Sequence, residues 1–199
     1  FIGTGGHGHT FPGAVVPHGM IQPSPDTRID GWDACSGYYY ADSTINGFSH
    51  THVSGTGCCD YGDVLLMPTV GKQQYRTTDP QSQRLAYASS FSHKNEIAEP
   101  GYYSVFLDTY QVKAEISSTK RGAIHRYTFP ENAESGFIID LDYSLQRQTN
   151  YEMEIEVISD TEICGHKKTT YWAFDQYINF YAKFSKPFAY TLITNSVTM

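Results

Sequence analysis

Two histidines alternate with glycines near the start of the chain. Residues 5–13 read Gly-Gly-His-Gly-His-Thr-Phe-Pro-Gly, a composition that excludes a helix or a regular strand. Glycine lets a backbone approach a ligand closely, so His7, His9 and Phe11 are candidate binding residues of a loop. The alternative is a structural turn whose histidines only hydrogen-bond the backbone.

Residues 26–40 concentrate carboxylate, guanidinium, hydroxyl and aromatic groups between glycines. The candidate binding residues in this block are Asp26, Arg28, Trp32, Asp33, Ser36 and Tyr38. A sugar presents hydroxyl edges and apolar C–H faces, which suit charged hydrogen-bonding groups beside an aromatic plate. The alternative interpretation is an aromatic core with solvated aspartates.

A second histidine pair, His50 and His52, has the spacing that would place both rings on one face of a strand. Such a pair could bind iron or zinc, as in a cupin-like jelly roll. A cupin-like metal site would also need a glutamate a few residues after the second histidine, and residues 53–57 contain none. We therefore expect no metal ion on this pair.

Cleavage of a glycosidic bond needs two carboxyl groups that flank the bond, an acid and a base or nucleophile. Glu152, Glu154 and Glu156 alternate with apolar residues, which is typical of the wet face of a half-exposed strand. Asp140 and Asp142 follow the same logic at a strand end. The sequence therefore predicts no catalytic carboxylate in this chain.

Short runs with period-two alternation follow one another from residue 64 onward, separated by turn residues. The runs that we predict as strands are 103–107, 112–116, 123–129, 137–141, 151–158, 178–184 and 188–193. Only residues 80–90 could form a short helix. This pattern predicts an all-β fold, an antiparallel β-sandwich with long Gly/His-rich loops, in one domain that spans residues 1–199.

The composition is that of an ordered protein, with 40% hydrophobic and 15% aromatic residues among 199. A net charge of −7 with scattered Lys and Arg disfavours nucleic acid as a partner. No run is long enough and apolar enough to span a bilayer, and the first residues of the given sequence do not have the charged-then-apolar pattern of a leader. The four cysteines, two of them adjacent, indicate neither a disulfide framework nor a zinc site.

An ordered series of blocks resembles glycoside hydrolase family 92. The series begins with Gly-Thr-Gly-Gly-His-Gly at 3–8 and Gln-Pro-Ser-Pro-Asp-Thr at 22–27, and it continues with Ile-Asn-Gly-Phe-Ser-His-Thr-His at 45–52. Further blocks lie at 12–14, 17–20, 31–32, 36–38, 54–63, 91–93, 100–103 and 114–116, with Glu96, Ala98, Arg121 and His125. Blocks this long and collinear are far more specific than one short motif.

The resemblance implies the N-terminal, supersandwich-like domain of a calcium-dependent exo-α-mannosidase that inverts the anomeric centre of terminal α-mannosides in N-glycans or mannans. It implies that the catalytic carboxylates and most calcium contacts lie on a C-terminal (α/α)6-barrel domain outside this chain. The Gly/His-rich loops, with His50 and His52 among them, would help to build the mannose pocket. A periplasmic or secreted bacterial location is also implied.

Three hypotheses follow from these observations. The first is a substrate-binding domain that is inactive alone, and the second is a self-sufficient carbohydrate-binding module or lectin. The third, a metal-dependent jelly-roll enzyme, predicts a stoichiometric metal ion on His50 and His52. Mannoside titration of the isolated chain separates the first two hypotheses, and elemental analysis tests the third.

Overall fold

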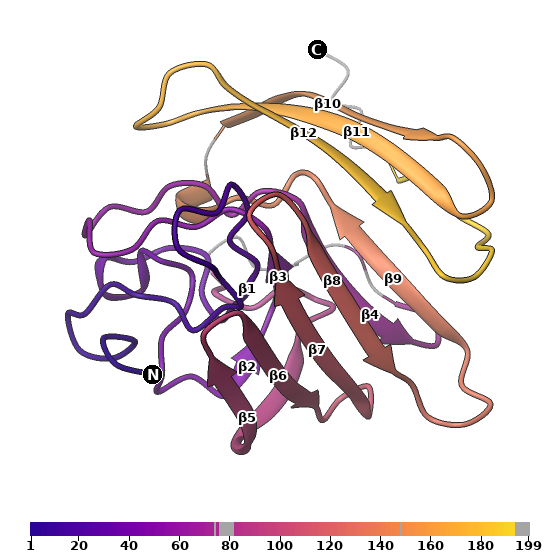
Figure 1. Ribbon diagram of the computed structural model, residues 1–199, viewed down its shortest axis with the longest axis horizontal. Helices are drawn as coiled ribbons and strands as arrows, with labels where there is room; N and C mark the ends of the chain where they lie inside the picture. Colours follow the sequence, from indigo (N-terminus) through magenta and orange to yellow (C-terminus); the bar gives the residue numbers. More distant parts are fainter. Residues whose placement is uncertain (74, 76–81, 148, 194–199) are drawn as a thin grey trace. The chain divides into compact units, whose positions relative to one another are not determined.

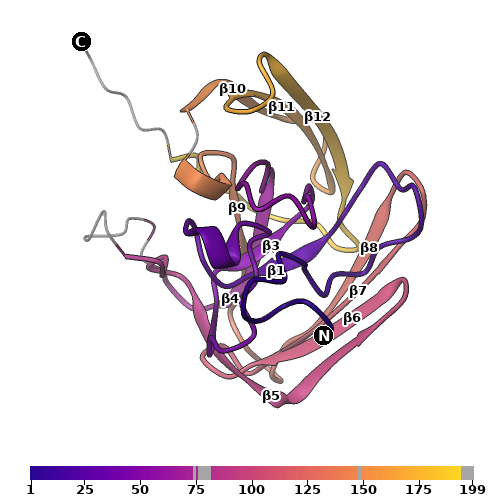
Figure 2. The same cartoon turned by 90° about the vertical axis from the view of Figure 1, so that its left-hand side faces the viewer.

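The computed structural model describes residues 1–73, 75, 82–147 and 149–193 (Figures 1 and 2). The chain forms two compact units, Phe1–Thr149 and Asn150–Met199. The assignment of residues 1–199 to one domain therefore stays a prediction. Within the described residues, no helix is long and apolar enough to cross a membrane.

The first unit contains two antiparallel sheets. The four-stranded sheet has the order β1-β3-β4-β9, with β1 (Ser24–Asp26), β3 (Gly47–Ser49), β4 (Leu65–Val70) and β9 (Ser135–Asp140). The five-stranded sheet has the order β2-β5-β6-β7-β8, with β2 (Thr44–Ile45), β5 (Ser89–Glu99), β6 (Tyr102–Leu107), β7 (Val112–Ser118) and β8 (Ala123–Thr128). Two short 3-10 helices, η1 (Trp32–Ala34) and η2 (Leu145–Arg147), lie in connecting segments.

The core lies between these two sheets. On β6 and β7 the buried apolar residues recur at every second position, and the register pairs Val105 with Ala114 and Leu107 with Val112, all four buried. Phe48 of β3 contacts the ring of Tyr103 on β6 edge-on, at 6.3 Å between the ring centroids. Each fully buried large apolar side chain contributes roughly 1.5–3 kcal/mol. The predicted antiparallel β-sandwich is confirmed.

The second unit holds a three-stranded antiparallel sheet with the order β10-β11-β12 (Figure 1). Its strands are β10 (Thr149–Val157), β11 (Glu162–Thr170) and β12 (Gln176–Lys183). Along β12, half-buried and exposed residues alternate strictly, which matches the period of two residues in a strand.

Most predicted strands are confirmed with shifts of one or two residues at their ends. The strand predicted at 188–193 is wrong: the backbone there pairs with no strand, and the N–H of Phe188 instead donates to the carbonyl of Asp160 at 2.9 Å. Pro187, which has no N–H, precedes it. The helix considered at 80–90 lies partly outside the described residues, and its described part contains no helix and ends in β5.

Candidate functional site

A partly exposed aromatic cluster stands on the loops of the first unit. Gly31 adopts φ 111°, and the chain then turns into η1, which begins at Trp32. The Trp32 side chain stays 58% exposed. The ring of His9 meets the indole edge-on at 4.3 Å, and the ring of His7 lies 4.9 Å away on the same indole.

A polar pair borders this cluster. Nδ1 of His7 pairs with a carboxylate oxygen of Asp33, which follows Trp32 directly. Both partners are open to solvent, with 72% of the His7 side chain and 40% of the Asp33 side chain exposed. The structure therefore brings together four residues of two separate candidate loops, with hydrogen-bonding groups beside an open aromatic face.

Backbone and hydroxyl groups fix His9 beneath Trp32. The carbonyl of His9 accepts from Oγ of Ser36 at 2.7 Å and from the N–H of Gly55 at 2.6 Å. A Cβ at Gly57 would stand 3.1 Å from Nε1 of Trp32 and 3.2 Å from the His9 ring. Ser36 is thus buried and supports the loop, and only a glycine at position 57 fits against the two rings without a shift.

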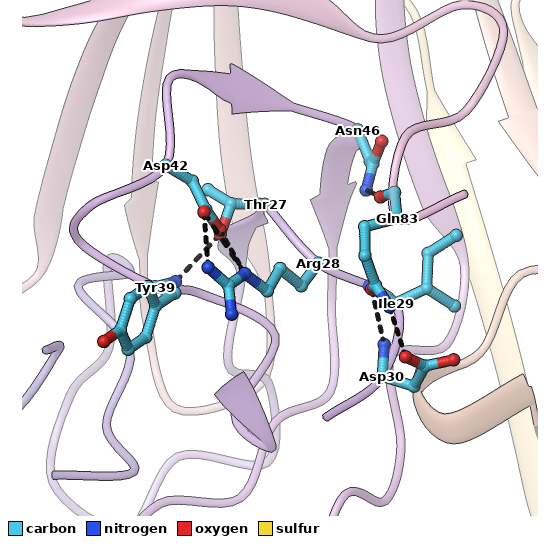
Figure 3. A network of polar contacts seen from close by, with 8 residues as sticks. All are labelled: Thr27, Arg28, Ile29, Asp30, Tyr39, Asp42, Asn46 and Gln83. Carbon is cyan, nitrogen blue, oxygen red and sulfur yellow. Dashed lines mark hydrogen bonds and ion pairs between the residues drawn. The ribbon is translucent and has the colours of Figure 1, made fainter. Parts of the chain in front are cut away.

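Arg28 is held in a single orientation (Figure 3). Its Nε and Nη2 donate to both carboxylate oxygens of Asp42 at 2.8–3.2 Å, and its guanidinium lies 4.3 Å above the Tyr39 ring. Thr27 also donates to Asp42, at 2.8 Å. The hydrogen bonds to Asp42 raise the pKa of Arg28. About a third of the Arg28 side chain remains exposed, so the guanidinium is fixed and accessible at once.

Asp26 and His52 form a buried pair below the loops. Nδ1 of His52 donates to the carbonyl of Gln22 at 2.7 Å. Its Nε2 lies 2.7 Å from Oδ1 of Asp26 and 3.1 Å from Oγ of Ser49. Neither side chain is exposed to solvent. Phe11 covers the His52 ring at 4.9 Å. These three predicted binding residues therefore lie beneath the exposed loop residues and support them.

His50 has other hydrogen-bond partners than His52 and belongs to a chain of three hydrogen bonds. Its Nδ1–H donates to the Val64 carbonyl at 2.6 Å, so its Nε2 accepts from Nε2–H of His125 at 3.1 Å. Nδ1 of His125 in turn accepts from the Tyr127 hydroxyl at 2.8 Å. Burial lowers the pKa of His50 and lowers that of His125 to about 3, so both rings stay neutral.

Tyr38 lies buried in the core. Its hydroxyl donates to the buried carboxylate of Glu96 at 3.0 Å, which also accepts from Tyr103 and His93 at 2.6 Å each. Burial, followed by the Glu96 charge, raises the pKa of Tyr38. Glu96 could not be recognised as a partner from local pattern, because its strand carries a register irregularity between Phe91 and Glu96 that hides the alternation.

The predicted site residues therefore divide into two groups. An exposed group stands at the surface: His7, Trp32, Asp33 and Arg28. A supporting group lies beneath: His9, Phe11, Asp26, Ser36, Tyr38, His50 and His52. Which of them contact a sugar stays a prediction.

The potential metal ligands of these loops do not gather into one site. In the part of the chain that the structure describes, no group of three or more His, Cys, Asp or Glu side chains could hold a metal ion. His50 and His52, the pair with metal-like spacing, are bonded to different partners. The described residues thus do not fit a calcium site, and no step of a reaction is assigned to a metal in this chain.

An exposed tryptophan beside two histidines and a fixed guanidinium offers an apolar plate and charged hydrogen-bonding groups, which suit the apolar face and the hydroxyl edge of a sugar. The profile described as the glycosyl hydrolase family 92 N-terminal domain matches residues 1–198. The chain belongs to this family, as its N-terminal domain.

Three known proteins are similar to this chain. A family 92 α-mannosidase of Bacteroides thetaiotaomicron, solved in complex with mannoimidazole, is 40% identical with a TM-score of 0.87, over 94% of this chain and 24% of that one. An inverting family 92 mannosidase of the same organism is 29% identical with a TM-score of 0.64, over 80% and 20%. An uncharacterized secreted glycosidase of Arthroderma benhamiae is 33% identical over 67% of this chain and 17% of the relative. The chain spans less than a quarter of each of these three relatives.

Proposed function

We propose that this chain forms the N-terminal, substrate-binding and structural part of an inverting exo-α-mannosidase that removes terminal α-mannosides from N-glycans or mannans. The observation that supports this proposal is the exposed indole of Trp32, with His7 and Asp33 at its border and His9 packed against it. Two family relatives that match more than three quarters of this chain are named mannosidases, which supports the substrate class.

Each exposed group has a role in this proposal. The Trp32 indole stacks on the apolar C–H face of a mannosyl residue, a contact type worth roughly 0.5–1.5 kcal/mol beyond burial. His7, Asp33 and the fixed Arg28 guanidinium bind hydroxyl groups at its edge. A guanidinium already immobilised by Asp42 loses little conformational entropy when it binds.

The catalytic acid and base are proposed to lie outside this chain. Asp140 accepts from the Tyr87 hydroxyl at 2.6 Å and from backbone N–H groups, so both its oxygens are engaged. On β10, Glu152 and Glu154 lie 3.9 and 4.0 Å from Lys168 and His166 of the adjacent strand. Such contacts are those of structural and surface carboxylates.

Calcium, the (α/α)6-barrel domain and secretion complete the proposal for the whole protein. The calcium ion would be held mainly by the barrel domain, since the described residues of this chain offer no ligand group. Secretion is supported by the relative from Arthroderma benhamiae that is named a secreted glycosidase. Membership of a hydrolase family disfavours a stand-alone lectin.

The test is made on the full-length protein that carries this chain. Incubated with α-linked mannobiosides, it should release mannose from the non-reducing end, and proton NMR of the first turnovers should show β-mannose before mutarotation. Release of α-mannose, or no mannose release from any α-linkage with and without added calcium, would overturn the proposal.

A further inference from the structure

We propose that Gln83 is a positioning residue for the substrate-facing Trp32 loop and that its amide acts as a clamp on the two residues before Gly31. The inference rests on the proposed mannoside site, because it assigns a residue that orients Trp32. Gln83 is not one of the residues expected to bind sugar, and it lies 53 positions downstream of Asp30, one of the two residues that it holds.

The Gln83 side chain uses both ends of its amide on this loop (Figure 3). Oε1 accepts from the backbone N–H of Ile29 at 2.9 Å and from that of Asp30 at 3.1 Å. Nε2 donates to the carboxylate of Asp30. A single side chain thus binds two successive backbone groups and one side chain directly before the turn at Gly31, in a segment outside the strand ladders.

A second amide holds the first one in place. Nδ2 of Asn46 donates to the backbone carbonyl of Gln83 at 2.8 Å, and its Oδ1 accepts from the N–H of Leu85 at 2.8 Å. Asn46 is fully buried and lies between β2 and β3, where its own N–H donates to the Asp26 carbonyl at 2.7 Å. The sandwich core therefore fixes Asn46, which fixes Gln83, which fixes the loop.

The opposite side of the same backbone is also engaged. The Ile29 carbonyl accepts from the N–H of Gln146 at 2.7 Å, and the Gly31 carbonyl lies 3.5 Å from Sγ of Cys59. The Ile29 side chain is buried in the core. The base of the loop is thus held from both sides, whereas the Trp32 side chain it carries is 58% exposed. A displacement of about 1 Å can cost 10²-fold in rate, so the position of residues 29–31 controls how the Trp32 indole contacts a substrate.

The clamp can be tested by reversing its donor and acceptor. Gln83→Glu keeps an acceptor for the two N–H groups but sets a second carboxylate against Asp30. Asp30→Asn alone keeps an acceptor for Nε2 of Gln83. The double variant Gln83→Glu/Asp30→Asn restores the contact with reversed polarity, because the side-chain amide introduced at position 30 can donate to the new carboxylate. The wild type and the three variants form a double-mutant cycle.

Two readouts are taken on the full-length protein. Hydrogen exchange by mass spectrometry follows the amides of residues 29–34, and kcat/KM is measured for an α-mannobioside, with the melting temperature as a control. Gln83→Glu is expected to speed exchange in this segment and to lower kcat/KM about tenfold or more, and the double variant to restore both to within about threefold of wild type.

The outcomes separate the failure of the clamp from that of the proposed function. Unchanged exchange in Gln83→Glu, or a double variant no better than Gln83→Glu, overturns the clamp. Faster exchange with unchanged kcat/KM shows that the clamp is merely structural and also overturns the inference. A wild-type protein that releases no mannose overturns the proposed function, and the exchange data then decide on the clamp alone.

Discussion

Gly37 is the position at which one methyl group should do most damage to the candidate site. It adopts φ 85°, and its carbonyl accepts from the N–H groups of Thr27 and Arg28 at 2.7 and 3.2 Å. A Cβ there would overlap Oδ1 of Asp26 and stand 3.3 Å from Nε2 of His52. Gly37→Ala must therefore displace the backbone or separate the buried Asp26–His52 pair.

The magnitude follows from two contributions. A left-handed conformation costs a residue with a Cβ roughly 1–2 kcal/mol, and leaving a buried hydrogen-bonding group without its partner costs roughly 1–3 kcal/mol. Their sum, about 2–5 kcal/mol, is a large share of the roughly 5–15 kcal/mol by which a domain is stable. We expect Gly37→Ala to lower the free energy of unfolding by about this amount or to prevent folding.

Gly71→Ala is the matched control. Gly71 has a similar φ, 73°, but a Cβ there would meet nothing within 4 Å, so only the backbone contribution of about 1–2 kcal/mol applies. Urea unfolding of wild type and both variants measures the difference. Equal losses in the two variants would refute the overlap with the Asp26–His52 pair as the reason that position 37 is a glycine.

Three further predictions concern activity, metal and pH. The isolated chain should show no α-mannosidase activity against an aryl mannoside, and it should not bind mannosides in a calorimetric titration. Turnover that scales with pure protein, or tight binding, would contradict the proposal that this chain supplies only part of the mannoside pocket. A chelator should abolish activity of the full-length protein, and calcium should restore it, whereas the melting temperature of the isolated chain should not respond, since its described residues offer no metal group. The free energy of unfolding should fall as the pH drops from about 6.5 towards 3, because burial lowers the pKa of His125 from 6.5 to about 3 and the unfolded chain therefore takes up the proton first. In a His125→Asn variant the free energy of unfolding should depend less on pH in this range. An unchanged pH dependence would contradict the neutral His50–His125 pair.

Alternation and turn residues are enough to predict the sandwich. On β6 and β7 the buried apolar residues fit a period of two, so these strands are evident from the sequence. β11 is not evident, because its covered positions include Lys167 and Thr169, which hide the apolar alternation. The aromatic segment at 188–193 has the composition of a strand but no ladder partner in the structure.

The candidate site could be predicted as a set of residue types but not as a geometry. The glycine-rich loops do bring His7 and His9 to Trp32, as loop composition suggests. Partners that are far away in sequence carry no local signal: Asp42 on Arg28 and Gln83 on Asp30 are ordinary polar residues until the fold brings them close. For the same reason, local pattern could not show that the Tyr38 hydroxyl bonds a carboxylate in the core.

The central claim, that the Trp32 loop forms part of a mannoside pocket, is tested most directly by Trp32→Ala in the full-length protein. Because the side chain is 58% exposed, its removal should leave the melting temperature nearly unchanged. We expect kcat/KM for an α-mannobioside to fall about tenfold or more, a loss of roughly 1.4 kcal/mol or more in transition-state binding. Unaltered kinetics in a normally folded protein, or a large loss of melting temperature, would place Trp32 outside the site.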